Sequence, residues 1–575
     1  MKQREPAPVN AAVPTAMHRL PVGRYHSRSA FAPALTLVCL LATECGGRSP
    51  VAAPPASPAR TARVAGAEWA RGAVFYEIFV RSFADSNGDG IGDLRGIITR
   101  LDYLNDGDPR TTADLGVDGI WLTPIWPSPS YHGYDVTDYA TVNPAFGGMA
   151  DFEELCRQAH RRGLRVVIDW VMNHTSDQHP WFVDASSSLR SARRDWYVWR
   201  TNDPGWPQPF GPGRTWHRSG DAFYYGLFVP EMPDLNYRNA GVRAEMARLA
   251  GAWLGRGADG LRLDAARYLV EDGPGAGQAD TLETHAVWKE FSAAVRDAAP
   301  DAVLIGESAT STEQIARYFG AARAGQVNDE LTTSFNFPLA AGIVAGVRTG
   351  CANDVLMALQ DMDRFYPPDA IDAPFLTNHD QVRLATQLDG APGKLRAAAA
   401  VLLTLPGAPF IYYGEELGMV NGRPGSDDRL KRTPFPWDRS ANGGFSTAAP
   451  WEPLAPGTDT ANVAAESADP ESLLLWYRGW IQTRRHSEAL RLGKLRVISQ
   501  PASACAPVLA FTRNAPGERA LVVHNLSSAS ATVQGIESLA WRCVRCNGAT
   551  LTTARGQSAV TVPAWGSAVW VVDVR

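Results

Sequence analysis

The stretch GLRLDAAR, residues 260–267, ends a short apolar strand in an aspartate. Arg262 and Asp264 stand two positions apart, so both side chains point to the same face of that strand. In α/β barrels, active sites lie where strands end and loops begin. This strand end is therefore a candidate for chemistry, and the ends of the other strands in the chain become candidates for the same reason.

Strand-like and helix-like segments alternate on both sides of this stretch. Strands alternating with helices over about 400 residues predict a parallel sheet. Seven or eight such units predict an α/β fold of the (β/α)8 TIM-barrel type, assigned to residues 67–488. The expected strands are residues 73–80, 119–122, 164–169, 260–264, 302–306, 373–376 and 409–413, and helical spacing occurs at 151–162, 242–254 and 284–299.

Two regions depart from this alternation. Between residues 174 and 233 there is no clear helix but much Trp, Pro and Gly, which predicts a domain inserted after the third strand. From residue 489 to 575 the pattern changes to short alternating strands, which predict a separate C-terminal antiparallel β-sandwich.

The beginning of the chain has the composition of a targeting segment. Residues 1–28 carry five Lys and Arg and one acid, and the next apolar run is too short to span a membrane, so residues 1–45 are expected to be a signal peptide. Cys45, followed by glycines and a Pro/Ala-rich tether at residues 46–66, resembles a bacterial lipoprotein. We expect a secreted or cell-envelope-anchored protein, with a lipid on Cys45 or plain secretion, and no transmembrane span in the mature chain. An extension without an export role is the other alternative.

The composition limits the function classes. Apolar residues make up 45% of the chain and charged residues 20%, which is typical of a globular protein. The 55 Lys and Arg stand against 60 Asp and Glu, so no basic surplus argues for a nucleic-acid partner. Cys543 and Cys546 have CxxC spacing, but no second pair or histidine cluster completes a zinc site. A disulfide or two buried thiols are expected there.

Acidic residues come at the ends of four expected strands: Asp169, Asp264, Glu307 and Asp380. One acid in such a place is usually a helix cap or a surface residue, but four of them converge on one end of a barrel. Glycoside cleavage with retention needs two carboxyl groups about 5–5.5 Å apart, one as nucleophile and one as acid/base. The set therefore predicts a glycoside hydrolase.

The two carboxyl roles need different protonation states. The acid must keep its proton near neutral pH, and the nucleophile must stay ionised. Arg262, on the same face as Asp264, favours Asp264 as the ionised nucleophile. Glu307 has no basic residue within two positions and is then the better acid. His174 and His379 are candidates to donate hydrogen bonds to sugar hydroxyls.

Five segments together resemble the α-amylase family, glycoside hydrolase family thirteen. The resemblance covers about residues 70–570, and it implies Asp264 as nucleophile, Glu307 as acid/base and Asp380 as a third acid that grips substrate hydroxyls and favours a distorted ring. It also implies that four residues shape the subsite of the cleaved bond: Arg262, His174, His379 and Asp169. The segments, in the family's order, are VVIDWVMNH (166–174), MPDLN (232–236), GLRLDAAR (260–267), IGE (305–307) and FLTNHD (375–380).

Aromatic residues add candidate sugar contacts. Tyr134 and Asp135, in HGYDVTDY (132–139), resemble the family's stacking tyrosine and its neighbour, with a core aromatic as the alternative for Tyr134. Part of the tryptophan surplus is expected to form a sugar-stacking surface, with Trp216 and Tyr134 as first candidates. Five of the 18 tryptophans fall in the inserted segment: Trp181, Trp196, Trp199, Trp206 and Trp216.

The loop DSNGDGIGD, residues 85–93, is a candidate Ca²⁺ site. Hard oxygen ligands at alternate positions suit Ca²⁺, although Gly96 in place of a glutamate and the preceding strand exclude an EF-hand. The loop resembles the calcium loop after the first barrel strand of the family, with a polar turn as the alternative. Tyr268 replaces the histidine that the family's second calcium site uses. The expected ligands are Asp85, Asn87, Asp89, Ile91 through its carbonyl, and Asp93.

Smaller features suggest the activity within the family. MPDLN lies between the QPDLN pattern of oligo-1,6-glucosidases and the MPKLN pattern of neopullulanases, and resembles an intermediate group that includes bacterial α-amylases. Ala265, after the nucleophile, is a small residue of the kind that goes with α-1,4 bonds in related glucosidases. We expect a monomeric α-amylase acting on starch or malto-oligosaccharides. Alternatives are an exo-acting α-glucosidase or oligo-1,6-glucosidase, a transglycosylase such as trehalose synthase, and a non-catalytic sugar-binding or transporter-associated relative.

Overall fold

The computed structural model describes residues 67–320, 328–425, 427–499, 505–554 and 556–574. The expected signal peptide, the tether and Cys45 lie outside these described residues. Among the described helices, none combines the length and the apolar character that a membrane crossing would need.

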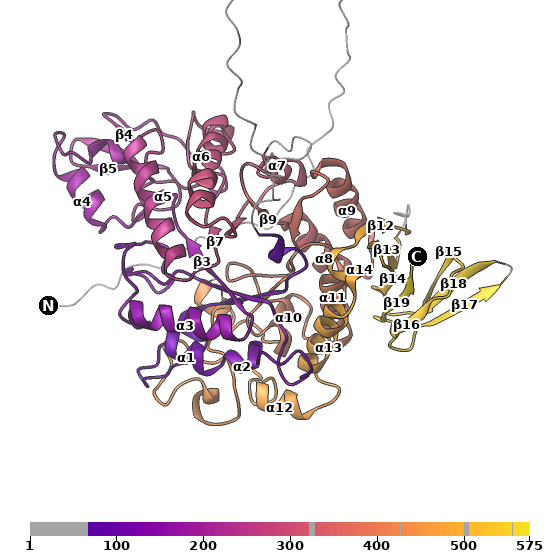
Figure 1. Ribbon diagram of the computed structural model, residues 1–575. Helices are drawn as coiled ribbons and strands as arrows, with labels where there is room; N and C mark the ends of the chain where they lie inside the picture. The colour runs from indigo at the N-terminus through magenta and orange to yellow at the C-terminus, as the bar shows by residue number, and fades with distance from the viewer. Residues whose placement is uncertain (1–66, 321–327, 426, 500–504, 555, 575) are drawn as a thin grey trace, which may run out of the picture. The chain divides into compact units, whose positions relative to one another are not determined.

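Eight parallel strands form the central sheet, in the order β10-β9-β8-β7-β3-β2-β1-β11. Its two ends meet where Phe375, just after β10, bridges to Phe410 of β11, so the sheet closes on itself. Figure 1 shows the helices around these strands. The predicted (β/α)8 barrel is confirmed. Its strands are β1 Phe75–Ile78, β2 Gly119–Leu122, β3 Arg165–Trp170, β7 Gly260–Leu263, β8 Val303–Gly306, β9 Thr333–Phe335, β10 Ile371–Ala373 and β11 Phe410–Tyr412.

The barrel strands are buried on both faces. All residues of β1, β2, β7 and β8 are buried, because the helices cover one face and the barrel interior the other. Phe75, Trp121 and Phe410 pack inside the barrel. Strand β9 was not among the expected strands, because it has only three residues and two of them are polar. The Thr333 hydroxyl donates to the Ile371 carbonyl across the sheet.

The helices between the strands begin at polar caps. The Thr281 hydroxyl accepts from the amide of Thr284 at the start of α6, and the Asn336 side chain accepts from Leu339 at the start of α8. The helices of the barrel region are α1 Leu94–Thr99, α2 Leu101–Leu104, α3 Met149–Arg161, α5 Ala240–Gly255, α6 Leu282–Ala298, α7 Thr312–Arg317, α8 Phe337–Thr349, α9 Asn353–Phe365, α10 Leu384–Gln387, α11 Pro392–Thr404, α12 Val463–Ala468, α13 Leu473–Arg485 and α14 Glu488–Leu492.

The segment between β3 and α5 forms a small unit of its own. It holds a three-stranded antiparallel sheet of β4 (Trp199–Arg200), β6 (Ala222–Tyr225) and β5 (Trp216–Ser219). The expectation of no helix here is wrong, because α4 spans Pro180–Ser187. A proline at its first position and the His179 side chain as N-cap stabilise this short helix.

After α14 the chain forms two antiparallel sheets, one of five strands and one of three. Leu521, Val560 and Trp570 belong to the apolar core that the two sheets share, so the predicted C-terminal β-sandwich is confirmed. Cys543 and Cys546 form a disulfide, which decides between the two alternatives for this pair. The strands are β12 Lys494–Val497, β13 Val508–Asn514, β14 Glu518–Asn525, β19 Ser567–Asp573 and β16 Arg542–Arg545 in one sheet, and β15 Ala531–Glu537, β18 Gln557–Val562 and β17 Thr550–Ala554 in the other.

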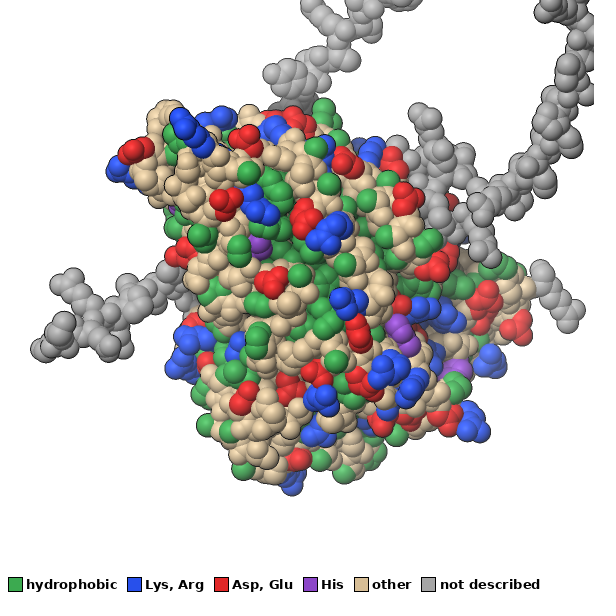
Figure 2. All heavy atoms as spheres, turned by 60° about the vertical axis from the view of Figure 1, so that its left-hand side comes forward, with side chains coloured by type: hydrophobic (Ala, Val, Ile, Leu, Met, Phe, Trp, Pro, Cys, Tyr) green, Lys and Arg blue, Asp and Glu red, His purple; other side chains and the backbone are tan. Residues whose placement is uncertain are grey.

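The described surface mixes both signs of charge. Figure 2 shows acidic and basic side chains interspersed over the face it presents, in agreement with the small net charge of −5.

Candidate active site

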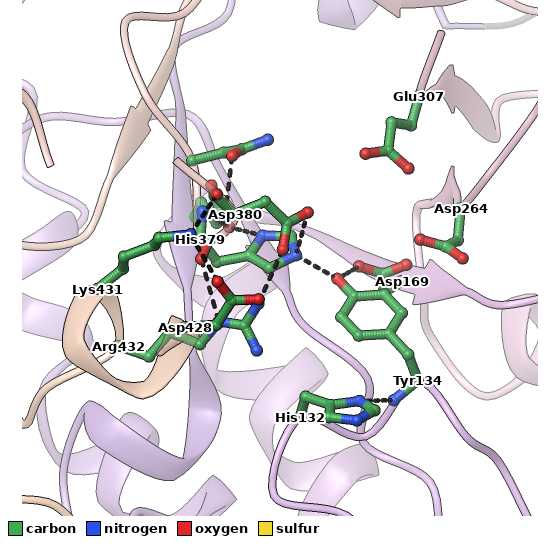
Figure 3. Close-up of polar contacts among 12 residues, drawn as sticks. His132, Tyr134, Asp169, Asp264, Glu307, His379, Asp380, Asp428, Lys431 and Arg432 are labelled. Carbon is green, nitrogen blue, oxygen red and sulfur yellow. Dashed lines mark hydrogen bonds and ion pairs between the residues drawn. The ribbon is translucent and has the colours of Figure 1, made fainter. Parts of the chain in front are cut away.

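The strand ends bring the expected acids together. Asp169 lies in β3 and pairs in register with Arg262 of β7. Asp264 and Glu307 directly follow the neighbouring strands β7 and β8, and Asp380 lies in the loop after β10. Figure 3 shows the carboxylates of Asp264, Glu307 and Asp380 directed toward a common space.

Arg262 is the fully buried cation at the base of this cluster. Its Nη1 donates to Asp169 Oδ1 at 2.9 Å and to Asp264 Oδ1 at 2.7 Å, and its Nη2 lies 2.9 Å from Glu307 Oε2. The expected contact of Arg262 with Asp264 is present, but Arg262 also reaches Glu307 and so does not by itself distinguish the nucleophile from the acid. Because β7 and β8 are adjacent strands, one guanidinium reaches both carboxyl groups, although Glu307 is far from any basic residue in sequence.

Burial is the largest effect on the two paired carboxyls. It raises the pKa of Glu307 to about 7 and that of Asp264 to about 7, while Arg262 lowers both. Two interacting groups with such pKa values share about one proton near neutral pH. One carboxylate and one carboxylic acid side by side are the protonation state that a retaining mechanism requires.

Asp380 differs from this pair because it is held among cations at the open side of the site, with its side chain 47% exposed. Arg432 Nη2 lies 2.8 Å from Asp380 Oδ1, and Lys431 Nζ donates to the Asp380 carbonyl at 2.7 Å. Burial raises the pKa of Asp380, but the neighbouring His379 ring and the cations Arg432, Arg262 and Lys431 outweigh it and lower the pKa to about 2. Asp380 is thus ionised at any working pH.

A hydrogen-bonded chain connects Asp169 to His379. The Tyr134 hydroxyl donates its single proton to Asp169 Oδ2 at 2.9 Å. His379 Nε2 lies 2.7 Å from the same hydroxyl oxygen and 3.3 Å from Asp380 Oδ2, so Nε2 must carry a proton. Burial lowers the pKa of His379 to about 3, so its ring is neutral and Nδ1 carries no proton.

Glu77 of β1 completes the chain. Its Oε1 lies 2.6 Å from the bare Nδ1 of His379, and burial raises the pKa of Glu77 well above its usual range. A protonated Glu77 therefore donates to His379 Nδ1 and fixes the tautomer of the ring. The same oxygen also accepts from the His379 amide at 3.3 Å, which fixes the ring's position.

Two other predicted substrate contacts, His174 and Asp135, form hydrogen bonds with the loop that carries Tyr134. His174 is buried, burial lowers its pKa to about 3, and its Nε2 donates to the Tyr134 carbonyl at 3.2 Å. Asp135 accepts from the hydroxyls of Ser128 and Ser130. In this structure both residues hold the loop that carries Tyr134, and Tyr134 itself is the one whose ring stacks on His379.

The backbone after Asp264 adopts an unusual conformation. Ala265 has φ +51°, in the left-handed region that few non-glycine residues occupy. Its amide donates to Glu307 Oε2 at 3.1 Å. Backbone strain of this kind costs about 1–3 kcal/mol and is found at functional sites; here it directs a backbone donor at the Glu307 carboxyl group.

The tryptophans of the inserted segment mostly pack against other aromatic rings. Trp216 is buried, with Trp206 and Tyr225 at ring distances of 5.5 and 5.3 Å, so the expectation that it lies on a sugar-stacking surface is wrong. Trp181 packs on Trp196 at 4.8 Å. The surplus of aromatic residues here builds the core of the small unit, because its short strands offer few aliphatic residues.

The 85–93 loop is held together by its own side chains. Asp85 accepts from the amides of Gly88 and Gly90, and Asp89 accepts from Ile91. Asp93 is the N-cap of α1. Within the described residues, no group of three or more His, Cys, Asp or Glu side chains is placed to hold a metal ion. The loop offers a mixed set of carboxylate, amide and carbonyl oxygens instead.

Comparison with known proteins agrees with this geometry. The model of the α-amylase catalytic domain matches residues 77–493. The chain belongs to the α-amylase family. It is 39% identical to α-amylase 3 of Dictyoglomus thermophilum over 465 residues, 80% of this chain and 85% of that relative. It is 35% identical to the trehalose synthase of a Pimelobacter species, over 80% of this chain and 87% of the relative.

A solved structure is similar over almost the whole described chain. The crystal structure of an α-amylase from H. orenii has a TM-score of 0.78 and 39% sequence identity, and covers 88% of this chain and 100% of that one. The present protein is thus an enzyme of the α-amylase family, a glycoside hydrolase or transglycosylase.

Sequence reasoning missed three side chains of this α-amylase-family site. Glu77 is the lone acid in the apolar run AVFYEIFV, and an unpaired acid inside a buried strand is a usable signal. Arg432 and Lys431 come from KRTPFPWD, far from Asp380 in sequence. No local pattern indicates that this loop reaches the end of β10.

Proposed function

We propose that the enzyme hydrolyses α-1,4-glucosidic bonds in starch or malto-oligosaccharides with retention of configuration, as an α-amylase. The observation that carries this proposal is the convergence of Asp264, Glu307 and Asp380 on one space, with Arg262 shared by the first two. The identity to a relative named α-amylase, 39%, exceeds the 35% to one named trehalose synthase, and supports hydrolysis over isomerisation.

In the proposed reaction, the Asp264 carboxylate attacks the anomeric carbon while Glu307 gives its proton to the departing glycosidic oxygen. Glu307 then takes a proton from water, and the water oxygen replaces Asp264 on the sugar. The backbone amide of Ala265 holds the carboxyl group of Glu307 in position. Asp380, kept ionised by Arg432, accepts hydrogen bonds from sugar hydroxyls, and these strengthen as the ring distorts.

Ala265 supports the choice of α-1,4 bonds. Its methyl group leaves more room beside the departing sugar than the valine that goes with α-1,6 bonds in related glucosidases. A β-branched side chain is also poorly tolerated at the φ of +51° found here.

Product analysis tests the activity. The enzyme is incubated with maltoheptaose, maltotriose and maltose, and the products are resolved by chain length. We expect a ladder of short maltodextrins from maltoheptaose. Glucose as the sole product would favour an exo-acting α-glucosidase, trehalose from maltose would favour a trehalose synthase, and no product at all would favour a non-catalytic relative.

We also propose that the 85–93 loop binds a structural Ca²⁺ ion. The residues fit in their chemistry: Asn87 Oδ1 and each carboxylate oxygen of Asp89 accept one hydrogen bond and retain a further lone pair, and the Ile91 carbonyl and Asp85 add further hard oxygen atoms. Asp85 and Asp93 are the most occupied of the five, since Asp85 accepts from Asn87, Gly88, Gly90 and Ser446, and Asp93 accepts from Ser86 and Gly96. Metal analysis of the purified chain after exhaustive buffer exchange tests this site.

Export is a proposal as well. We infer that residues 1–45 direct export, either with a lipid anchor on Cys45 or as plain secretion, and that the mature enzyme is a monomer. Detergent phase partitioning of the native protein and of the Cys45→Ser variant tests the anchor. Light scattering during size-exclusion chromatography tests the oligomeric state.

A further inference from the structure

Two cysteines meet where the barrel contacts the C-terminal β-sandwich. Cys351 lies between α8 and α9, and Cys505 lies just before β13. The residues after them are joined directly, since the Ala352 amide donates to the Ala506 carbonyl at 2.7 Å. The Cys505 thiol lies within hydrogen-bonding range of Cys351 and 3.6 Å from the Gly350 carbonyl.

The backbone holds this meeting point in place. Gly350 ends α8 with φ +77°, and the amide of Cys351 returns to the carbonyl of Gly346. On the other side, the Ala506 amide donates to the Asn353 side chain at 3.2 Å. Both thiols are thus positioned by hydrogen bonds of their neighbours.

Both thiols are also accessible to an oxidant. Cys505 is exposed and Cys351 is half-buried, whereas Cys156 is buried. Burial raises the pKa of the Cys156 thiol far above its usual range, so that thiol is inert and serves as an internal control.

We propose that Cys351 and Cys505 form a disulfide that ties the barrel to the β-sandwich. The oxidant is an external disulfide such as oxidised glutathione. The thiolate of one cysteine attacks a sulfur of that disulfide and releases one thiol, and the second cysteine then displaces the other. The two protein thiols together lose two protons and two electrons, one S–S bond forms, and the oxidant is reduced to two thiols.

The expected consequence is greater thermal stability without a change in catalysis. A cross-link between segments so distant in sequence restricts the unfolded chain and opposes local separation of the two domains. Neither cysteine contacts a residue of the acid cluster.

Peptide mapping of the full chain tests the proposal. The folded protein is equilibrated in oxidised and reduced glutathione, free thiols are blocked with iodoacetamide, and the chain is digested with trypsin without reduction. We expect residues 349–364 and 497–513 to appear as one linked peptide that separates on reduction. Recovery of both peptides alkylated, or each carrying glutathione, would overturn the proposal.

Cysteine-to-serine variants distinguish the stabilising effect of a disulfide from the effect of side-chain packing, because only the disulfide depends on the redox conditions. Cys351→Ser and Cys505→Ser should each lower Tm by about 3 °C or more under oxidising conditions and have no such effect under reducing conditions, while Cys156→Ser should keep the same difference in Tm between the two conditions as wild type. Equal Tm values for wild type in both conditions would contradict a stabilising disulfide. The kcat on maltoheptaose should be the same in all forms.

Discussion

Replacement of Glu77 by leucine should lower both stability and activity, because it removes the hydrogen-bond partner of His379. The change leaves Nδ1 and the amide of His379 without their shared partner in a buried position. Each orphaned buried polar group costs about 1–3 kcal/mol, so we expect the two together to lower the free energy of unfolding by about 2–6 kcal/mol. If about 2 kcal/mol of that is also lost in the transition state, kcat falls roughly 30-fold.

Replacement of Glu77 by glutamine should be much milder than replacement by leucine. A glutamine amide can donate to Nδ1 as the protonated carboxyl group does, and it preserves the chain through His379 to Tyr134. We expect kcat and KM on maltoheptaose within about fivefold of wild type, because the glutamine NH2 keeps the bond to Nδ1 and loses only the longer acceptance from the His379 amide at 3.3 Å. The pH profile of kcat should also be unchanged, since a neutral group replaces a neutral group.

Both variants are measured for kcat, KM and Tm beside a matched control. Glu416→Gln replaces another buried glutamic acid, which accepts from the Tyr76 hydroxyl, and it should leave kcat unchanged. The reasoning is refuted if Glu77→Gln loses as much activity as Glu77→Leu while both remain folded. That result would mean that an ionised Glu77 is required.

Three further changes have definite expected outcomes. Arg432→Met removes a cation that lowers the pKa of Asp380, so the pKa of the Asp380 carboxyl group, followed by NMR of the carbon-13-labelled protein, should rise; an unchanged pKa would show that Arg432 does not control Asp380. Addition of a chelator should lower Tm by several degrees, and calcium but not sodium should restore it; a chelator without effect would count against Ca²⁺ in the 85–93 loop. Trp216→Ala should cost about 3–5 kcal/mol of stability, because it empties a buried aromatic site. A rise in KM with unchanged Tm would instead return Trp216 to the substrate surface.

The barrel and its acids could be predicted because the relevant signals are local. Strands β3, β7 and β8 are short buried runs with an acid at or just after the end, and the ends of parallel strands share one side of a barrel. The short strand β9 could not be predicted, since Thr333 and Ser334 interrupt its apolar pattern. The start of β10 at Ile371 lies two residues before the expected position for a similar reason, because Asp372 is polar.

The electrostatics of the site depend on contacts between segments distant in sequence. Proximity along the chain suggested that Arg262 serves Asp264, but the adjacency of β7 and β8 gives Glu307 an equal share. Arg432 reaches Asp380 from a loop after β11. The prediction that Trp216 lies on a sugar-stacking surface was wrong, because a count of tryptophans does not show whether they form a core or a surface.

The proposed catalysis depends above all on Asp264 forming a covalent bond to the sugar while Glu307 provides the proton. A fluorinated α-glucosyl fluoride that slows release of the sugar should trap this state, and tryptic cleavage after Arg262 and Arg267 isolates the labelled aspartate in residues 263–267. We predict one glucosyl label on that peptide and none in the Asp264→Asn variant. A label elsewhere, or no label together with an inverted first product by NMR, would contradict the assignment.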